Sequence, residues 1–331
     1  MKPASIIALL TISSTAAIAQ NRAGDEPVSA PCLELNQAAM TQAVSGHLAE
    51  AEKSVLAARI SSDERTQGAC LGQIFGNMAG VISVSGRNAE AERLAEQSVR
   101  ILEKFYSPDD WVLLRPLQIL AAVWLELGKT AQARQAVNRI QSIRIKCPED
   151  RVIVHTIIAA LLQIEGRQSE AEAEYHDAFR AVEEAGRDDS ANAASILYGL
   201  GSLYLKEQRM DEARRALDRA LAIYDRAEDA APLDRIKFLD LRGVLHARLD
   251  EWQQSEQDFC DGLSMLDRQP YADPALLRSF LTNYSYVLRR NHHRKEARSI
   301  EARNTALPTN RTTAAVVDLT ELVIEKKAAK K

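Results

Sequence analysis

A small residue recurs at intervals of 38–42 positions along this chain, inside an alanine-rich helical pattern. The seven small residues, called the anchors below, are Ala51, Ala91, Ala133, Ala171, Ala213, Ser255 and Ala297. Five residues before each anchor lies a turn position, and these are Gly46, Gly86, Gly128, Gly166, Gln208, Asp250 and His292. Glycine suits a left-handed residue that ends one helix before the next begins. The period therefore predicts seven stacked helical hairpins.

A second set of small residues, called the partner positions, lies twelve residues before the anchors. Its members are Ala39, Ala79, Ala121, Ala159, Gly201, Gly243 and Ser285. Small residues at both places let the two helices of a hairpin approach closely. Prolines lie 23 or 25 residues before four anchors, where they can occupy the first turn of a helix: Pro108, Pro148, Pro232 and Pro274. With only 14 glycines and 10 prolines in 331 residues, a many-stranded sheet protein is disfavoured and an all-α fold is expected.

One repeat carries a recognisable motif, Leu197-x-x-Leu200-Gly201-x-x-Tyr204, followed by Ala213 and Ala220. It resembles the pattern of the tetratricopeptide repeat (TPR) family. The spacing is longer than the family's usual repeat of about 34 residues, and is similar to the kinesin-light-chain type. The resemblance implies a right-handed superhelix of about seven TPR hairpins over residues 32–307. It also implies a concave groove that binds protein or peptide partners.

The chain begins with the pattern of a signal peptide. Residues 1–19 have one cation, Lys2, before an apolar run from Ala4 to Ala17, and they end in Ala17-Ile18-Ala19. An uncleaved anchor is the alternative, but the run is short and rich in Ser and Thr for a membrane span. We therefore expect an exported protein, periplasmic or secreted, with no stable membrane insertion after cleavage. Residues 20–31 are expected to be a flexible leader.

Residues 308–331 follow the repeats and end in four lysines, Lys326, Lys327, Lys330 and Lys331. We expect a capping segment and a basic tail. A solvated, frayed end is favoured over a tether to an anionic surface. A second basic cluster, Arg289, Arg290, Arg294 and Lys295, lies near the end of the repeats. A solvated helix face is the favoured interpretation there too.

The four cysteines form no CxxC motif and no cluster with histidine, which argues against zinc and thioredoxin-type chemistry. Cys32 and Cys70 lie near the starts of neighbouring first helices, so a disulfide between them is a candidate. Cys147 and Cys260 are expected to be unpaired.

No catalytic pattern is present in the sequence. The six histidines form no HExxH motif, and GxSxG and GxxxxGK[ST] are absent. The net charge of −4 offers no overall basic field for nucleic acid. We therefore expect a non-enzymatic protein with no cofactor and no metal site.

The repeat register also selects the side chains of the expected groove. They lie six, three or two residues before a partner position, or one after it. The candidates are Asn77, Arg115, Gln118, Tyr198, Ser202, Lys237, Asp240, Asn283 and Tyr286. Amide side chains there can hydrogen-bond an extended peptide, whereas the alternative for each is an ordinary solvated side chain. The predicted function is an exported scaffold, monomeric by default, that binds a protein or peptide in this groove. The alternative is a structural subunit or co-chaperone of an envelope complex that uses its convex face or its tail.

Overall fold

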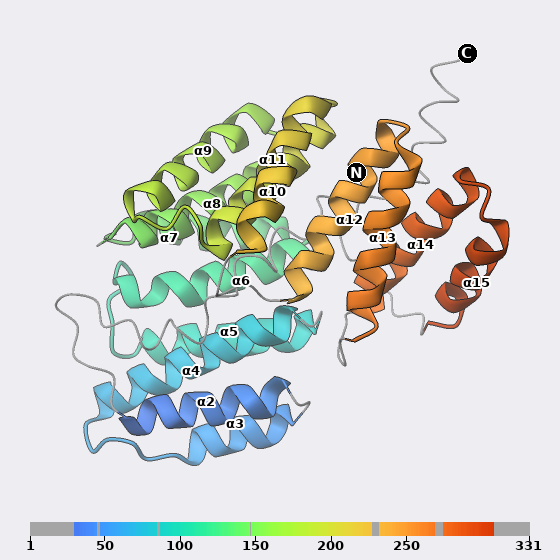
Figure 1. Ribbon diagram of the computed structural model, residues 1–331. Helices are drawn as coiled ribbons and strands as arrows, with labels where there is room; N and C mark the ends of the chain where they lie inside the picture. The colour runs from blue at the N-terminus through green and yellow to red at the C-terminus, as the bar shows by residue number, and fades with distance from the viewer. Residues whose placement is uncertain are drawn as a thin grey trace. The chain divides into compact units, whose positions relative to one another are not determined.

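The computed structural model describes residues 30–44, 47–84, 87–145, 147–226, 232–268 and 274–307. Across these ranges the regular elements are all helices (Figure 1). The predicted signal peptide, most of the predicted leader, the residues after 307 and the turn glycines Gly46 and Gly86 lie outside the described residues. None of the helices described here is both long and apolar enough to cross a membrane.

The helices follow one another as seven pairs, each made of a first and a second helix. The pairs are α2 (Ala30–Val44) and α3 (Leu48–Ala57), α4 (Glu64–Val84) and α5 (Asn88–Leu102), α6 (Leu114–Glu126) and α7 (Thr130–Ser142), α8 (Pro148–Glu165) and α9 (Gln168–Glu184), α10 (Ala191–Lys206) and α11 (Met210–Tyr224), α12 (Pro232–Arg248) and α13 (Trp252–Leu266), and α14 (Pro274–Arg290) and α15 (Arg294–Thr305). A short 3-10 helix, η2 (Trp111–Leu113), precedes α6. The all-α fold of helical hairpins is confirmed.

The turns inside the hairpins have the predicted left-handed backbone. Gly128 and Gly166 have φ of 71° and 82°, and Gln208, Asp250 and His292 have φ of 63°, 59° and 65°. Around Gly166, its own N–H donates to the Gln163 carbonyl and the Arg167 N–H donates to the Leu162 carbonyl. These two hydrogen bonds satisfy the last carbonyls of the first helix and fix the angle at which the second helix begins.

The small residues hold the two helices of each hairpin together, as predicted. All seven anchors have an exposed fraction of 0%. A Cβ atom on Gly201 would lie 2.7 Å from Leu217, and one on Gly243 would lie 2.8 Å from Phe259, so neither position accepts a larger side chain without movement. The Ser255 hydroxyl donates to the Gly243 carbonyl over 2.7 Å, which joins an anchor directly to its partner position.

Three of the four prolines predicted to lie in the first turn of a helix do so. Pro148, Pro232 and Pro274 are the first residues of α8, α12 and α14. Pro108 is different, because it lies in a turn before η2 and α6 begins only at Leu114. There the N-terminal turn is capped by Asp110, which accepts a hydrogen bond from the Val112 N–H.

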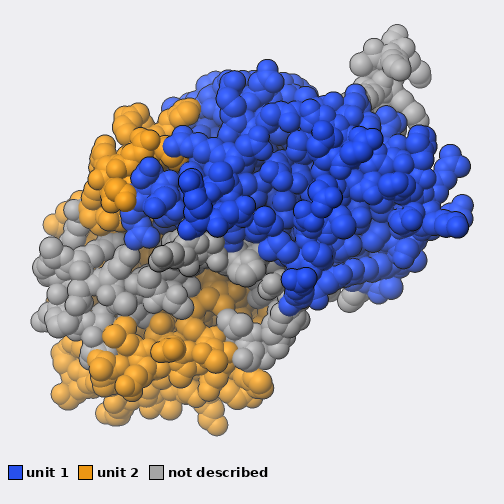
Figure 2. All heavy atoms as spheres, viewed as in Figure 1, with its two compact units in different colours: residues 1–6, 162–175, 187–331 blue, residues 7–161, 176–186 orange. Residues whose placement is uncertain are grey.

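The chain divides into two compact units, which are coloured separately in Figure 2. Unit 2 contains residues 7–161 and 176–186, and unit 1 contains residues 1–6, 162–175 and 187–331. Within unit 1, each helix from α10 to α15 packs on the next, and the first helices α10, α12 and α14 also contact one another in turn. Within unit 2, α2, α4 and α6 contact one another in the same way. Each unit therefore has its own row of first helices.

Candidate functional site

The inner face of each unit is the side of its first helices that is turned away from the second helices. In unit 2 it begins at a disulfide: Cys32 on α2 and Cys70 on α4 are bonded, with their Cα atoms 6.0 Å apart. Both cysteines are buried. The bond ties together the two first helices at the N-terminal end of the described chain.

Polar side chains of neighbouring first helices meet on this inner face. Asn77 on α4 donates from its amide to the Asn36 side-chain oxygen over 3.2 Å, and both residues are buried. The next candidates, Arg115 and Gln118, lie on α6, where Arg115 is half-buried and Gln118 is buried. The polar side chains predicted for unit 2 therefore follow one another across α2, α4 and α6.

The inner face of unit 1 starts with a tyrosine and a serine on α10. The Ser202 hydroxyl lies 3.4 Å from the Gln163 amide nitrogen, and the Tyr175 hydroxyl donates to the Gln163 side-chain oxygen over 3.0 Å. Tyr198 packs edge-on against Phe238 of α12 with ring centroids 5.2 Å apart. Tyr198 thus contributes to packing between first helices, in addition to any contact with a ligand.

A carboxylate and an amide bridge the next two first helices. Asn283 on α14 lies 3.4 Å from an oxygen of Asp240 on α12. Burial raises the pKa of Asp240 to about 7, and the hydrogen bond from Asn283 acts in the opposite direction. Lys237 lies one helical turn before Asp240 and is also buried. A titratable carboxylate therefore lies in the middle of the unit 1 inner face.

The last candidate, Tyr286, belongs to a group that the sequence alone did not reveal. Its ring lies 6.1 Å from that of Trp252, the first residue of α13, and the Arg290 guanidinium lies 4.6 Å above the Trp252 ring. Tyr286 and Trp252 are half-buried and Arg290 is exposed. We call these three residues the aromatic cluster. Trp252 is outside the register of the first helices, so the register could not select it.

The nine candidates differ in accessibility. Seven of the nine are buried, with exposed fractions of at most 6%: Asn77, Gln118, Tyr198, Ser202, Lys237, Asp240 and Asn283. Arg115 and Tyr286 are half-buried. The prediction from the repeat register did not include the bridges between adjacent first helices. The sequence signal for those bridges was the spacing of polar residues about one repeat apart, as in Asn36 and Asn77 or Asp240 and Asn283. That any of the nine binds a partner stays a prediction.

Charged groups between consecutive hairpins form a second recurring arrangement, on the second helices. An acid one residue after an anchor receives a cation and a neutral donor from the next hairpin. Glu92 accepts from Lys129 at 2.6 Å and from the Trp124 ring N–H at 2.7 Å. In the same way, Glu172 accepts from Arg209 at 2.7 Å and from the Tyr204 hydroxyl at 2.9 Å. The sequence analysis missed these pairs, although their spacing of about one repeat is visible in it.

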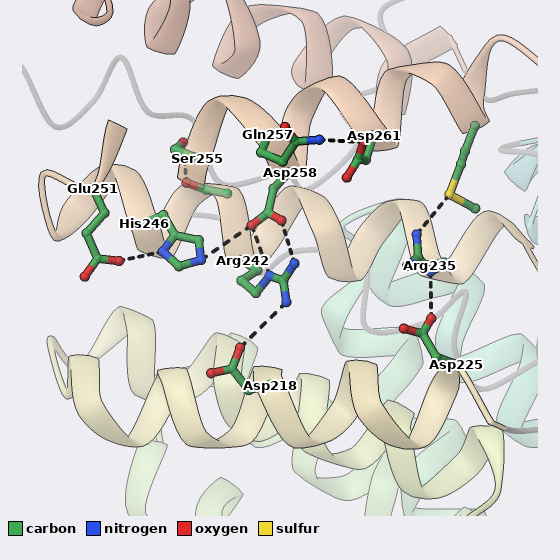
Figure 3. Close-up of polar contacts among 12 residues, drawn as sticks. Asp218, Asp225, Arg235, Arg242, His246, Glu251, Ser255, Gln257, Asp258 and Asp261 are labelled. Atoms are coloured by element: carbon green, nitrogen blue, oxygen red, sulfur yellow. Dashed lines mark hydrogen bonds and ion pairs between the residues drawn. The ribbon is translucent and has the colours of Figure 1, made fainter. Parts of the chain in front are cut away.

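At α12–α13 the acid and the cation exchange places: the cation follows the anchor and the next hairpin supplies the acid. Arg214 follows its anchor and pairs with Glu251 at 2.6 Å. Figure 3 shows the same carboxylate against His246, and Asp258 between His246 and Arg242. Each acid in this group faces a base, and within the described ranges no group of three His, Cys, Asp or Glu residues is placed to hold a metal ion. The group joins α11, α12 and α13 and provides no free nucleophile.

Comparison with known proteins agrees with this geometry. The sequence profile of the tetratricopeptide repeat family matches residues 150–226. Residues 150–226 carry tetratricopeptide repeats. No curated protein sequence matches it. Among solved structures, a tetratricopeptide repeat protein from Parabacteroides merdae shares 15% identity and a TM-score of 0.50, over 90% of this chain and 97% of that one.

Two further structures share the fold. A Rap protein complexed with competence and sporulation factor has 16% identity and a TM-score of 0.55, over 93% of this chain and 78% of that one. Aspartyl phosphate phosphatase F from Bacillus subtilis has 13% identity and a TM-score of 0.54, over 86% of this chain and 73% of that one. At such identities the likeness concerns the fold alone. The TPR fold is a helical repeat scaffold suited to protein interaction.

Proposed function

We propose that this chain is an exported, non-enzymatic TPR scaffold that binds a protein or peptide on its inner face. The aromatic cluster of unit 1 carries the proposal most strongly. Tyrosine, tryptophan and arginine are the residues that dominate binding energy at protein interfaces. Here Tyr286 and Arg290 of the first helix α14 meet Trp252 at the start of the second helix α13, and both rings are half-buried.

The polar part of the inner face supports a peptide-like ligand. Side-chain amides and carboxylates recur there on successive first helices. An amide can donate to a backbone C=O or accept from a backbone N–H of an extended chain, and a carboxylate can accept from a backbone N–H. The Rap protein whose fold is similar was solved in complex with competence and sporulation factor. Export rests on the signal-like pattern of residues 1–19.

The experiment is an affinity capture with the chain from Gln20 onward, which is the form that signal cleavage would leave. An envelope extract of the source organism supplies the partner, and mass spectrometry identifies it. The test variant combines Tyr286→Ala with Trp252→Ala. Tyr198 is not substituted, because its ring packs on Phe238 and its loss would disturb the fold.

The control variant combines Leu56→Ala with Ile145→Ala. These are exposed large apolar residues, with exposed fractions of 56% and 43%, and neither lies on a first helix. A partner lost by the test variant and kept by the control supports the inner face. A partner kept by both variants but lost on deletion of residues 308–331 supports the alternative, a structural subunit or co-chaperone that uses its tail. A well-folded chain that captures nothing contradicts the scaffold function.

A further inference from the structure

The last hairpin, α14–α15, has a charge unlike the rest of the chain. Residues 274–307 contain seven arginine and lysine residues and two acidic residues, whereas the whole chain has a net charge of −4. Arginines and lysines are exposed at five positions around its turn: Arg289, Arg290, Arg294, Lys295 and Arg298. α15 is the final helix of the described chain (Figure 1). Such a local excess of one charge in an oppositely charged protein indicates an interaction surface.

Two of these cations lie where they weaken the helix that carries them. Arg294 and Lys295 are the first two residues of α15. The N-terminus of a helix has a partial positive charge, so cations there are unfavourable and acids are favourable. The first turns of α3, α5 and α9 contain an acid and no cation, Glu50, Glu90 and Glu170 respectively. In α15 the corresponding acid, Glu296, is present, but the two cations precede it.

Other arginines of unit 1 lie at the opposite pole of a helix, where they stabilise it. Arg248 donates to the Leu205 carbonyl at the end of α10 over 3.0 Å. Arg278 donates to the Asn304 carbonyl at the end of α15 over 3.4 Å. Both arrangements place a cation on unsatisfied helix carbonyls. The placement of Arg294 and Lys295 is therefore not explained by the stability of the fold.

Three acids near this hairpin are paired with other cations. Glu301 pairs with Arg289 at 2.6 Å, Glu256 with His293 at 2.8 Å, and Asp267 with Arg303. In contrast, no ion pair within 4.0 Å joins Arg294, Lys295 or Arg298 to an acidic side chain among the described residues, and only Arg298 acts on one of these acids, Glu301, through its charge. At 100° per residue, these three lie within a 100° arc of α15. We call them the terminal basic face.

We propose that the terminal basic face docks on an anionic lipid bilayer surface. The face is an exposed side of one helix, so it matches a plane of charged headgroups better than an extended acidic peptide, which needs a groove. No tyrosine, tryptophan or phenylalanine lies within α15 to stack on nucleic acid bases. A cation near an anionic membrane strengthens binding about fivefold. Three cations together give roughly a hundredfold preference for anionic over neutral lipid.

The experiment is vesicle co-sedimentation of the chain from Gln20 onward. One vesicle set contains phosphatidylcholine alone, and the other contains 30% phosphatidylglycerol in about 50 mM salt. The test variant carries Arg294→Gln, Lys295→Gln and Arg298→Gln. The control variant carries Lys53→Gln, Arg100→Gln and Arg215→Gln, which remove the same charge from exposed positions elsewhere.

We expect the unsubstituted chain and the control to bind the anionic vesicles, and the test variant to bind them roughly a hundredfold less. Raising the salt to about 500 mM should release the bound chain, because salt screens the attraction. The test variant should melt at the same or a higher temperature than the unsubstituted chain, so a loss of binding cannot be a loss of folding.

Four results would overturn the proposal. They are no preference of the unsubstituted chain for phosphatidylglycerol, an equal loss in both variants, full binding by the test variant, and binding to soluble polyglutamate as tight as to vesicles at equal charge. The third result would move the contact to the lysines after residue 325. The fourth would assign the face to an acidic protein.

Discussion

Replacing Gln208 by glycine should stabilise the hairpin α10–α11. Gln208 has φ of 63°, and its side chain is exposed. The left-handed conformation costs an L-residue about 1–2 kcal/mol, because its Cβ approaches the following carbonyl. Glycine avoids that cost but loses more backbone freedom on folding, about 0.4–1 kcal/mol. The net gain is therefore about 0.5–1 kcal/mol.

Hydrogen–deuterium exchange, read by mass spectrometry for peptides of α10 and α11, measures the local opening free energy. The expected gain slows exchange about two- to fivefold. Gln208→Ala is the matched control, because it removes the side chain and keeps the left-handed cost. Gly128→Ala is the reverse test and should speed exchange in α6 and α7, since a Cβ there meets nothing within 4 Å and only the backbone is strained. If Gln208→Gly speeds exchange, or Gln208→Ala slows it equally, the backbone argument is wrong.

Three further predictions concern other contacts. Cys32→Ser with Cys70→Ser should lower the free energy of unfolding of the first repeats by about 4 kcal/mol, because the disulfide closes a loop of 38 residues. Urea unfolding with and without reductant measures this loss, and no change would mean that the reduced chain holds α2 equally well. Arg214→Glu should destabilise the α11–α13 contact by placing like charges together, and adding Glu251→Arg should restore it, with a coupling free energy of about 0.5–1 kcal/mol in a double-mutant cycle. Because burial raises the pKa of Asp240 to about 7 in the folded chain, against 3.8 without burial, the folded state holds its proton between these values while the unfolded state loses it. Stability should therefore fall as pH rises from about 4 to about 7, by at most about 1.4 kcal/mol per pH unit, and Asp240→Asn should flatten that slope in urea unfolding at pH 5 and pH 7.

The hairpins could be predicted from sequence because each repeat poses the same local problem. A first helix must end, turn and pack closely on a second helix, and only a few residue types allow this. The fully buried Ala171 and the left-handed Gly166 follow directly from those needs. Even Gln208, Asp250 and His292 keep the left-handed turn without glycine, because the helices on both sides determine the backbone there.

The inner face was less predictable because its contacts join different repeats. Register places Asp240 and Asn283 on the same side of their helices, but it does not say that they bridge α12 and α14. Trp252 reaches Tyr286 from the start of a second helix, so no rule based on first helices could select it. Burial of Tyr198 likewise depends on Phe238, which lies 40 residues away in sequence.

The departures from the repeat pattern therefore carry more information than the pattern itself. The hairpin contacts of α8–α9 and α12–α13 illustrate this: Glu172 offers an acid to the next hairpin, and Glu251 presents an acid to the previous one. If α12–α13 were stacked directly on α9, those two acids would face each other, and like charges at such a position are destabilising. The reversed pair of Arg214 and Glu251 thus matches the charge of α13 to that of its neighbour α11. The cations at the start of α15 also break the pattern, but they favour no contact within the described chain, which is why we assign them to a surface outside it.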